Sequence, residues 1–378
     1  MTYEIIGGKC VIPVGVRVIE NGAFRDCESL TSIEVPYGVK EIGNEAFDGC
    51  HNLQAIVLPN SVTKIGERAF ANCRSLISIE IPYSVTIIGE EAFRDCSSLN
   101  SIMIPANTKA ECWGKVFLSC SSLSTIVVSK NNAEYKSINN SILSKDGKEL
   151  LLCRSAIIPE GVSMIANSAF EGCDLTEIEI PEGVTAIGDE AFYLCYELRS
   201  IKIPDSVKAI GYAAFQDCEH LQSIVIPDGV RKIEDYTFCN CASLQSIEIP
   251  QSVTEIGVYT FSSCGCLQSI VIPCGVTVIE EGLFSGCDTL QSIEIPDGLI
   301  VIEDNVFEDC ALQSVTIRTL EKGPNLSYKN IQFILQALSE ISKSLEINLR
   351  VPIGCGYAYR RYSRFAGKLT KIIADVSD

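Results

Sequence analysis

The 378-residue chain has no apolar stretch long enough to cross a membrane, and it is poor in positive charge. Lys and Arg number 30 against 48 Asp and Glu, giving a formal net charge of -18 at pH 7. This charge repels a phosphate backbone and an anionic membrane surface. The sequence therefore predicts neither nucleic acid binding nor membrane insertion. The start of the chain lacks the basic and apolar segments of an export signal, which favours the cytoplasm, or a secreted or cell-surface protein if a signal was trimmed.

Histidine is also scarce, because His51 and His220 are the only two and lie several repeats apart. We therefore predict no histidine-based catalytic triad. Carboxylates recur as surface positions and not as one unlike pair in a cleft, and no glycine-rich phosphate loop follows a strand. We therefore predict no enzyme activity, no catalytic residue, no cofactor and no small-molecule substrate.

The chain is built from a short repeat. Most of the prolines are spaced by 23 residues, and the unit reads P-x-[GS]-V-x-x-I-[GE]-x-x-A-F-x-x-C-x-x-L-x-x-I-x-I, as in Pro59 to Ile81. The step from Pro105 to Pro159 is longer, and it contains Asp146-Gly147, a strong signal for a two-residue hairpin turn. We therefore predict that a hairpin is inserted in one repeat.

A unit of 23 residues holds too few apolar side chains to close a core alone, so copies must stack and share one. The L-x-x-I-x-I segment places alternate residues on opposite faces of a short strand, so that Ile247 and Ile249 face in and Glu248 faces out. A second short strand is expected from Val253 to Ile256, and a helical turn at the A-F-x-x-C corner. The pattern predicts a β-rich solenoid with parallel sheets.

The unit resembles the BspA-like leucine-rich repeat family, whose repeats end in I-P and carry A-F-x-x-C before L-x-x-I-x-I, as Ala46 to Cys50 and Leu53 to Leu58 do here. The likeness covers roughly residues 12 to 318. It implies a leucine-rich repeat right-handed superhelix, and surface adhesion or host-protein binding as in some members of the family.

The two ends of a solenoid expose a strand edge and an open core, so both need caps. We expect a capping hairpin in residues 1–12, the solenoid in 13–318 with a hairpin insertion at about 129–158, and a C-terminal cap in 319–378. The cap is predicted to contain an amphipathic helix, because apolar residues recur at helical spacing: Ile331, Ile334, Leu335, Leu338, Ile341 and Leu345.

Twelve of the 19 cysteines, from Cys27 to Cys310, occupy the same position in the repeat. Side chains in such a column run parallel, whereas a disulfide requires Cβ atoms aimed at each other. We therefore expect buried free thiols, which favour a reducing compartment. Cys239, Cys241, Cys264 and Cys266 lie in adjacent repeats and leave zinc binding as a remote alternative.

Outward-facing positions repeat in register and form ladders along the sheet. One ladder, the position before the last Ile of each repeat, runs Glu34, Val57, Glu80, Met103, Val127, Glu179, Lys202, Val225, Glu248, Val271, Glu294, Thr316. Because like charges opposite each other destabilise paired strands, structure alone explains why Glu never neighbours Glu. This repulsion does not explain why Val and Met occupy the positions between the Glu residues, on a face that could have been wholly polar. The stripe is a candidate protein-binding surface; the alternative is packing between flanking side chains.

Three tyrosines, Tyr212, Tyr236 and Tyr259, fall within one position of each other in successive repeats. Tyrosine is enriched at binding surfaces, so we add them to the candidate partner-binding residues, with chance clustering as the alternative. The sequence thus predicts a non-catalytic protein-interaction scaffold that binds a macromolecular partner on its repeat face, as an adhesin-like bacterial surface protein would. An intracellular structural or assembly scaffold is the alternative, and a metal-binding protein or enzyme is a remote one.

Overall fold

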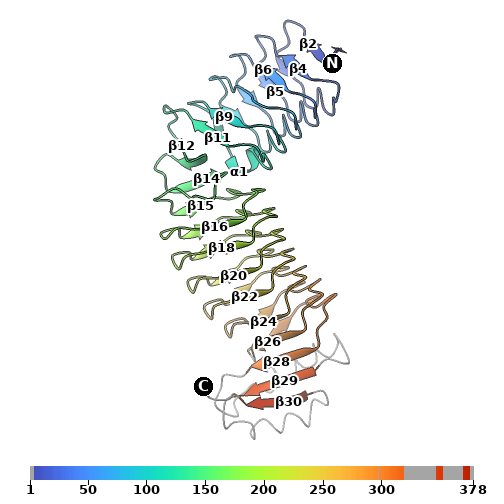
Figure 1. Ribbon diagram of the computed structural model, residues 1–378, viewed down its shortest axis with the longest axis vertical. Coiled ribbons are helices and arrows are strands. Elements are labelled where there is room, and N and C mark those ends of the chain that lie inside the picture. Colours follow the sequence, from blue (N-terminus) through green and yellow to red (C-terminus); the bar gives the residue numbers. More distant parts are fainter. Residues whose placement is uncertain (1–3, 297, 319–345, 352–368, 375–378) are drawn as a thin grey trace. The chain divides into compact units, whose positions relative to one another are not determined.

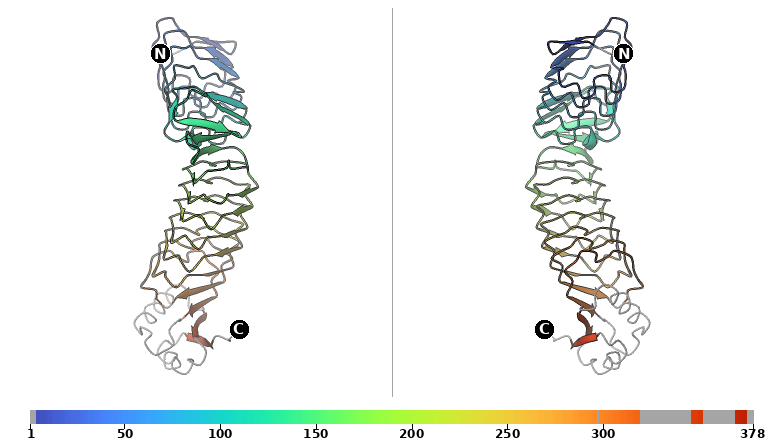
Figure 2. Two further views of the ribbon diagram at one scale, coloured as in Figure 1. Left: turned by 90° about the vertical axis from the view of Figure 1, so that its left-hand side faces the viewer. Right: turned by 90° about the vertical axis from the view of Figure 1, so that its right-hand side faces the viewer.

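The computed structural model describes residues 4–296, 298–318, 346–351 and 369–374. The chain is a β-solenoid of about 13 turns, with parallel sheets and, in these residues, almost no helix. It divides into two compact units. Unit 1 comprises Met1–Leu175 with Glu190–Cys195, and unit 2 comprises Thr176–Asp189 with Tyr196–Asp378. Within each unit, successive turns of the chain lie one above the next, as Figure 1 and the side views of Figure 2 show.

Unit 1 contains two kinds of strand in each turn, and each kind pairs with its copy one turn away. The L-x-x-I-x-I segments form what we call the long strands, which are β2 (Lys9–Val11), β4 (Ser32–Glu34), β6 (Ala55–Val57), β9 (Ser101–Ile104) and β11 (Thr125–Val128). The V-x-x-I segments form the short strands, which are β3 (Val18–Ile19), β5 (Glu41–Ile42), β7 (Lys64–Ile65), β8 (Ile87–Ile88) and β10 (Lys109–Ala110). Parallel pairing joins β2 to β4 and β4 to β6, joins β9 to β11, and links all five short strands in order. At the N-terminal end, β1 (Ile5–Ile6) pairs antiparallel with β2.

The long proline step of unit 1 contains the hairpin that its Asp-Gly signal predicts. Strands β13 (Ser141–Ser144) and β14 (Glu149–Cys153) pair antiparallel, with Gly147 at a left-handed φ of 81°. A strand that the sequence did not reveal, β12 (Tyr135–Ile138), pairs antiparallel with β13. On its other edge β14 pairs in parallel with the short strand β15 (Met164–Ile165), so the insertion is part of the stack.

Unit 2 repeats the same plan. Its long strands are β16 (Glu177–Glu179), β18 (Ser200–Lys202), β20 (Ser223–Val225), β22 (Ser246–Glu248), β24 (Ser269–Val271), β26 (Ser292–Pro296) and β28 (Ser314–Arg318). Its short strands are β17 (Ala186–Ile187), β19 (Ala209–Ile210), β21 (Lys232–Ile233), β23 (Glu255–Ile256), β25 (Val278–Ile279) and β27 (Val301–Ile302). Strands β29 (Glu346–Val351) and β30 (Leu369–Ala374) extend the sheet of β28 in parallel. The amphipathic helix predicted around residues 331–345 lies outside the described residues.

The corner of each turn differs from the helical turn that the sequence predicts. Alternate N–H groups bond three residues back, as Asp48 N–H does to the Glu45 carbonyl at 3.1 Å, while the others bond to the next turn, as Phe47 N–H does to the Ala69 carbonyl at 2.8 Å. Residues two before and two after the corner Phe have left-handed φ angles, 56° at Glu45 and 75° at Gly49. Because left-handed residues cannot continue a right-handed helix, the corner takes part in turn-to-turn pairing instead. Helix among the described residues is confined to α1 (Trp113–Val116).

The core consists of columns of identical side chains. Corner phenylalanines stack on their copies, with ring centroids of Phe24 and Phe47 5.0 Å apart and of Phe238 and Phe261 5.7 Å apart. The predicted column of cysteines is free of disulfides, and its thiols donate to the corner Phe carbonyl one turn back, as Cys50 Sγ does to Phe24 at 3.0 Å. Burial raises the pKa of Cys50 to about 12, so the thiol stays protonated and able to donate.

Candidate functional site

The outward ladder of the long strands begins in unit 1 with three residues in register. Val11 of β2 lies opposite Glu34 of β4, which lies opposite Val57 of β6. Their sequence neighbours on the same strands, such as Ile33, are buried, because successive side chains of a strand point to opposite faces. Val11 is 84% exposed and Val57 is 60% exposed, so two aliphatic side chains flank one carboxylate in solvent.

A hollow of about 490 Å³ lies over these three strands. Lys9, Val11, Glu34, Ala55 and Val57 are among the residues that line it. The hollow therefore coincides with the first ladder positions that the sequence singled out. Val11 was missed because the prediction assigned residues 1–12 to a cap, although the repeat spacing places it one turn before Glu34.

Further along unit 1 the ladder continues with Glu80 and Met103. Glu80 is exposed and follows an isolated bridge between Ser78 and Ser101, whereas Met103 of β9 lies opposite Val127 of β11. Met103 is 62% exposed. Neither Glu34 nor Glu80 has a side-chain hydrogen bond or ion pair with any described residue, so both carboxylates remain available to a partner.

In unit 2 the first two residues of the ladder form an ion pair with each other, whereas the residues after them include exposed valines. Lys202 of β18 lies opposite Glu179 of β16 and forms an ion pair with it, which raises the pKa of Lys202. The charge of Lys202 is therefore already matched. Beyond it, Val225 lies opposite Glu248, and Val271 lies opposite Glu294. Val225 is 63% exposed, and the Glu248 carboxylate has no side-chain partner among the described residues.

The three tyrosines lie on the corners of unit 2, in a different segment of each turn from the long strands. The rings of Tyr236 and Tyr259 stack with centroids 5.5 Å apart, and Tyr212 meets Tyr236 edge-on at 5.7 Å. Tyr259 Oη donates to Glu281 Oε1 at 2.9 Å. The structure thus joins these residues into a column, but as a surface of their own and not as part of the Glu and Val ladder.

The four cysteines considered as zinc ligands differ in burial, and Cys239 is half-buried. Cys241 and Cys264 are buried and donate to the carbonyls of Phe215 and Phe238, whereas Cys266 is exposed. In the described part of the chain no three His, Cys, Asp or Glu side chains are grouped so that they could hold a metal ion. His51 and His220 each use Nδ1 for a backbone carbonyl, that of Asn72 and that of Tyr196.

Comparison with known proteins decides the family. The BspA type leucine rich repeat region, in six copies, matches residues 12–146, 150–265 and 210–334. The chain belongs to this family. A leucine-rich repeat protein from Bacteroides ovatus has a similar structure, with a TM-score of 0.53 and 24% identity over 92% of this chain and 97% of that one. A leucine rich cell surface protein from Faecalibacterium prausnitzii has a TM-score of 0.51 and 26% identity over 100% of this chain and 87% of that one. No curated protein matches.

As a BspA-type leucine-rich repeat protein, the chain presents its variable residues on a constant framework. Columns of Phe, Cys, Leu and Ile fix the turns, and the outward positions of the long strands are left to vary from turn to turn. Among the described residues, no helix is long and apolar enough to span a bilayer. The long-strand ladder is therefore the strongest candidate binding surface on geometric grounds.

Proposed function

We propose that this chain is a non-catalytic scaffold that binds a protein partner along the outward ladder of its long strands. The supporting observation is the in-register alternation of exposed aliphatic side chains with carboxylates, as in Val11, Glu34 and Val57. Aliphatic area supplies affinity on desolvation, and carboxylates supply charge complementarity and orientation. The partner is therefore expected to present Lys or Arg between aliphatic side chains.

A place on the bacterial cell surface is part of this proposal. Support comes from the protein of Faecalibacterium prausnitzii described as a leucine rich cell surface protein. An assembly scaffold inside the cell is the second candidate, favoured by the buried free thiols of the cysteine column. Labelling intact source cells with a membrane-impermeant biotin reagent separates the two, because only a displayed chain is labelled before the cells are broken.

The binding face is tested by photo-crosslinking. Benzoylphenylalanine replaces Val271 on the ladder in one variant and the exposed Ile300 before β27 in the other. The ladder variant is expected to give a discrete crosslinked partner from cell or host extract, and the Ile300 variant is expected to give none. Equal crosslinking from both positions would remove the face assignment.

The partner found in this way is then used to measure affinity. Glu248→Lys and Glu294→Lys combined with Val271→Lys should weaken binding at least about tenfold, since a tenfold change needs only 1.4 kcal/mol. The matched control carries Glu197→Lys, Glu219→Lys and Ile300→Lys, which make the same change of charge and remove one exposed aliphatic side chain at positions off the ladder. Both variants should keep the melting temperature of the parent chain. A control that weakens binding as much as the ladder variant would show that net charge, and not the face, determines affinity.

A further inference from the structure

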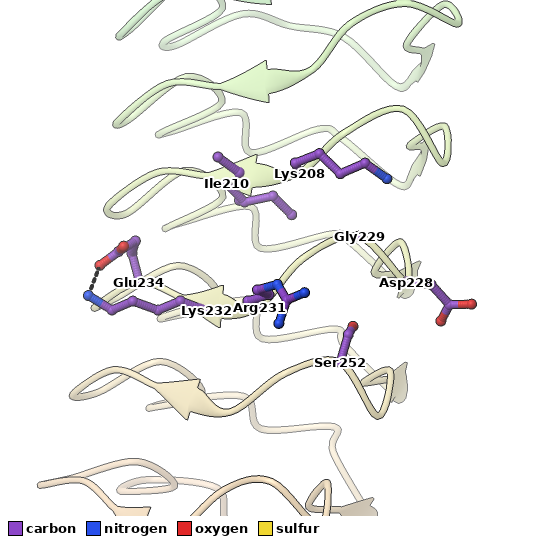
Figure 3. Close-up of a pocket in the computed structure, with 9 residues that line it drawn as sticks. Lys208, Ile210, Asp228, Gly229, Arg231, Lys232, Glu234 and Ser252 are labelled. Atoms are coloured by element: carbon purple, nitrogen blue, oxygen red, sulfur yellow. Dashed lines mark ion pairs between the residues drawn. The ribbon is translucent and has the colours of Figure 1, made fainter.

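Positive charge gathers at one place on the short strands of unit 2, although acidic residues outnumber basic ones 48 to 30 in the chain. Lys208, Arg231 and Lys232 line a hollow of about 720 Å³ together with Gly229 and Ser252. Lys208 and Arg231 occupy the same repeat position in successive turns, one residue before β19 and β21 respectively. Figure 3 shows their side chains on adjacent turns. This cationic hollow is not part of the long-strand ladder.

Two of the three positive charges are not matched by a carboxylate. Lys232 Nζ forms an ion pair with Glu234 Oε2 at 2.6 Å, as the dashed line in Figure 3 shows, so its charge is matched. Lys208 Nζ donates to the backbone carbonyl of Asp205 at 2.7 Å, which is a neutral acceptor. The Arg231 guanidinium makes no hydrogen bond or ion pair with any residue that the structure describes. Asp228 at the rim points away from Arg231 in Figure 3.

Gly229 places the Lys208 side chain over the hollow. A Cβ atom at residue 229 would lie 2.3 Å from Cδ and from Nζ of Lys208, so the lysine lies directly across the glycine backbone. The turns before and after carry Ser206 and Ser252 at the same repeat position. Glycine here leaves room for the lysine side chain, and the hydrogen bond to the Asp205 carbonyl holds its ammonium group there.

We propose that the cationic hollow binds carboxylate side chains of an acidic segment of a partner protein. A guanidinium group binds a carboxylate through two parallel N–H···O bonds, and an adjacent ammonium group adds a point charge. Nucleic acids and sulfated glycans carry dense charge over long stretches, which the surrounding negative charge of the chain repels. A short acidic segment needs only Lys208 and Arg231, the two cations that no carboxylate matches, and avoids most of that repulsion. The hollow is thus a second recognition site whose charge preference is opposite to that of the ladder.

The test uses the full chain and a fluorescein-labelled hexaglutamate peptide, followed by fluorescence anisotropy at low salt. The parent chain is expected to bind, and Lys208→Gln with Arg231→Gln should weaken binding at least about tenfold. Gly229→Ala, which keeps every charge but displaces the Lys208 side chain, should weaken binding about threefold. The control Lys64→Gln with Lys109→Gln removes two cations that already pair with Glu41 and Glu134, and should change affinity less than about twofold.

Three results would overturn the proposal. The first is no binding of the peptide by the parent chain, and the second is an equal loss in the double variant and its control, which would reflect net charge alone. The third is tighter binding of a heparin oligosaccharide than of hexaglutamate with the same dependence on Lys208 and Arg231, which would make a glycan the occupant. Far-ultraviolet circular dichroism of each variant confirms that the solenoid is retained, so that a loss of binding reports on the hollow.

Discussion

At the scale of single residues, the inserted hairpin interrupts the columns that the repeat predicts. The Phe stack of unit 1 reaches Phe117 and resumes at Phe170. Between them Arg154 Nη2 donates to the Phe117 carbonyl at 2.6 Å, and Cys173 Sγ donates to the Cys153 carbonyl. Arg154 thus donates to a phenylalanine carbonyl where a column cysteine does so elsewhere, and the Cys153 carbonyl accepts where a corner phenylalanine carbonyl does so elsewhere. The sequence could not reveal this, because residues 129–158 do not follow the repeat.

Beside this interruption lies Glu171, a buried carboxyl group that is expected to make stability depend on pH. Its pKa is raised to about 7, chiefly by burial; the Glu190 charge adds to the rise, and Ser168, Lys115 and Arg154 oppose it. The folded state therefore binds the proton more tightly than the unfolded state, whose pKa is near 4.5. Stability from this group is fully present below the unfolded pKa and is lost as pH rises through about 7.

The measurement is the melting temperature of the parent chain and of Glu171→Gln between pH 5 and pH 8. The free energy of unfolding of Glu171→Gln, relative to that of the parent chain, should increase as pH rises, by at most about 3 kcal/mol. Its melting temperature should therefore rise relative to that of the parent. Glu160→Gln, which changes an exposed carboxylate of the same unit, serves as control and should follow the parent. A difference between Glu171→Gln and the parent that does not vary with pH would contradict the burial argument.

At the scale of elements, the repeat predicted the strands well and the corner poorly. Alternation in L-x-x-I-x-I fixes which side chains point inward, so the strands near Ile247 and Ile256 lie where expected. The corner was predicted as a helical turn because Ala, Phe and Cys have helical spacing. Several residues of the corner have a left-handed φ, such as Tyr236 with φ 57°. Tyrosine rarely adopts this conformation, so the sequence does not indicate it. The register of the ladder was predictable, whereas the pairing of Lys202 and the separate tyrosine column required the structure.

The corner geometry predicts unequal effects of alanine at two glycines. Gly22 has φ +62°, and an added Cβ would meet only Arg25 Cβ at 3.9 Å, so Gly22→Ala should cost about 1 kcal/mol of backbone strain. Gly282 has φ +60°, and its Cβ would lie 2.2 Å from Cε1 of Tyr259. Gly282→Ala should therefore lower the melting temperature more than Gly22→Ala and also change the near-ultraviolet circular dichroism of the tyrosine column. Equal effects on the melting temperature would show that the Tyr259 ring moves aside at no cost.

At the scale of the whole molecule, a repeat that contacts only its neighbours makes stability local. Phe238 stacks on Phe215 and Phe261 and is fully buried, so Phe238→Ala leaves a cavity worth roughly 3–5 kcal/mol. Hydrogen exchange followed by mass spectrometry should show faster exchange in the strands of the adjacent turns, such as β22, and unchanged exchange in β4 of unit 1. Faster exchange throughout the chain would instead show that the turns unfold together, and a partner bound to one stretch of the ladder would then stabilise all of it.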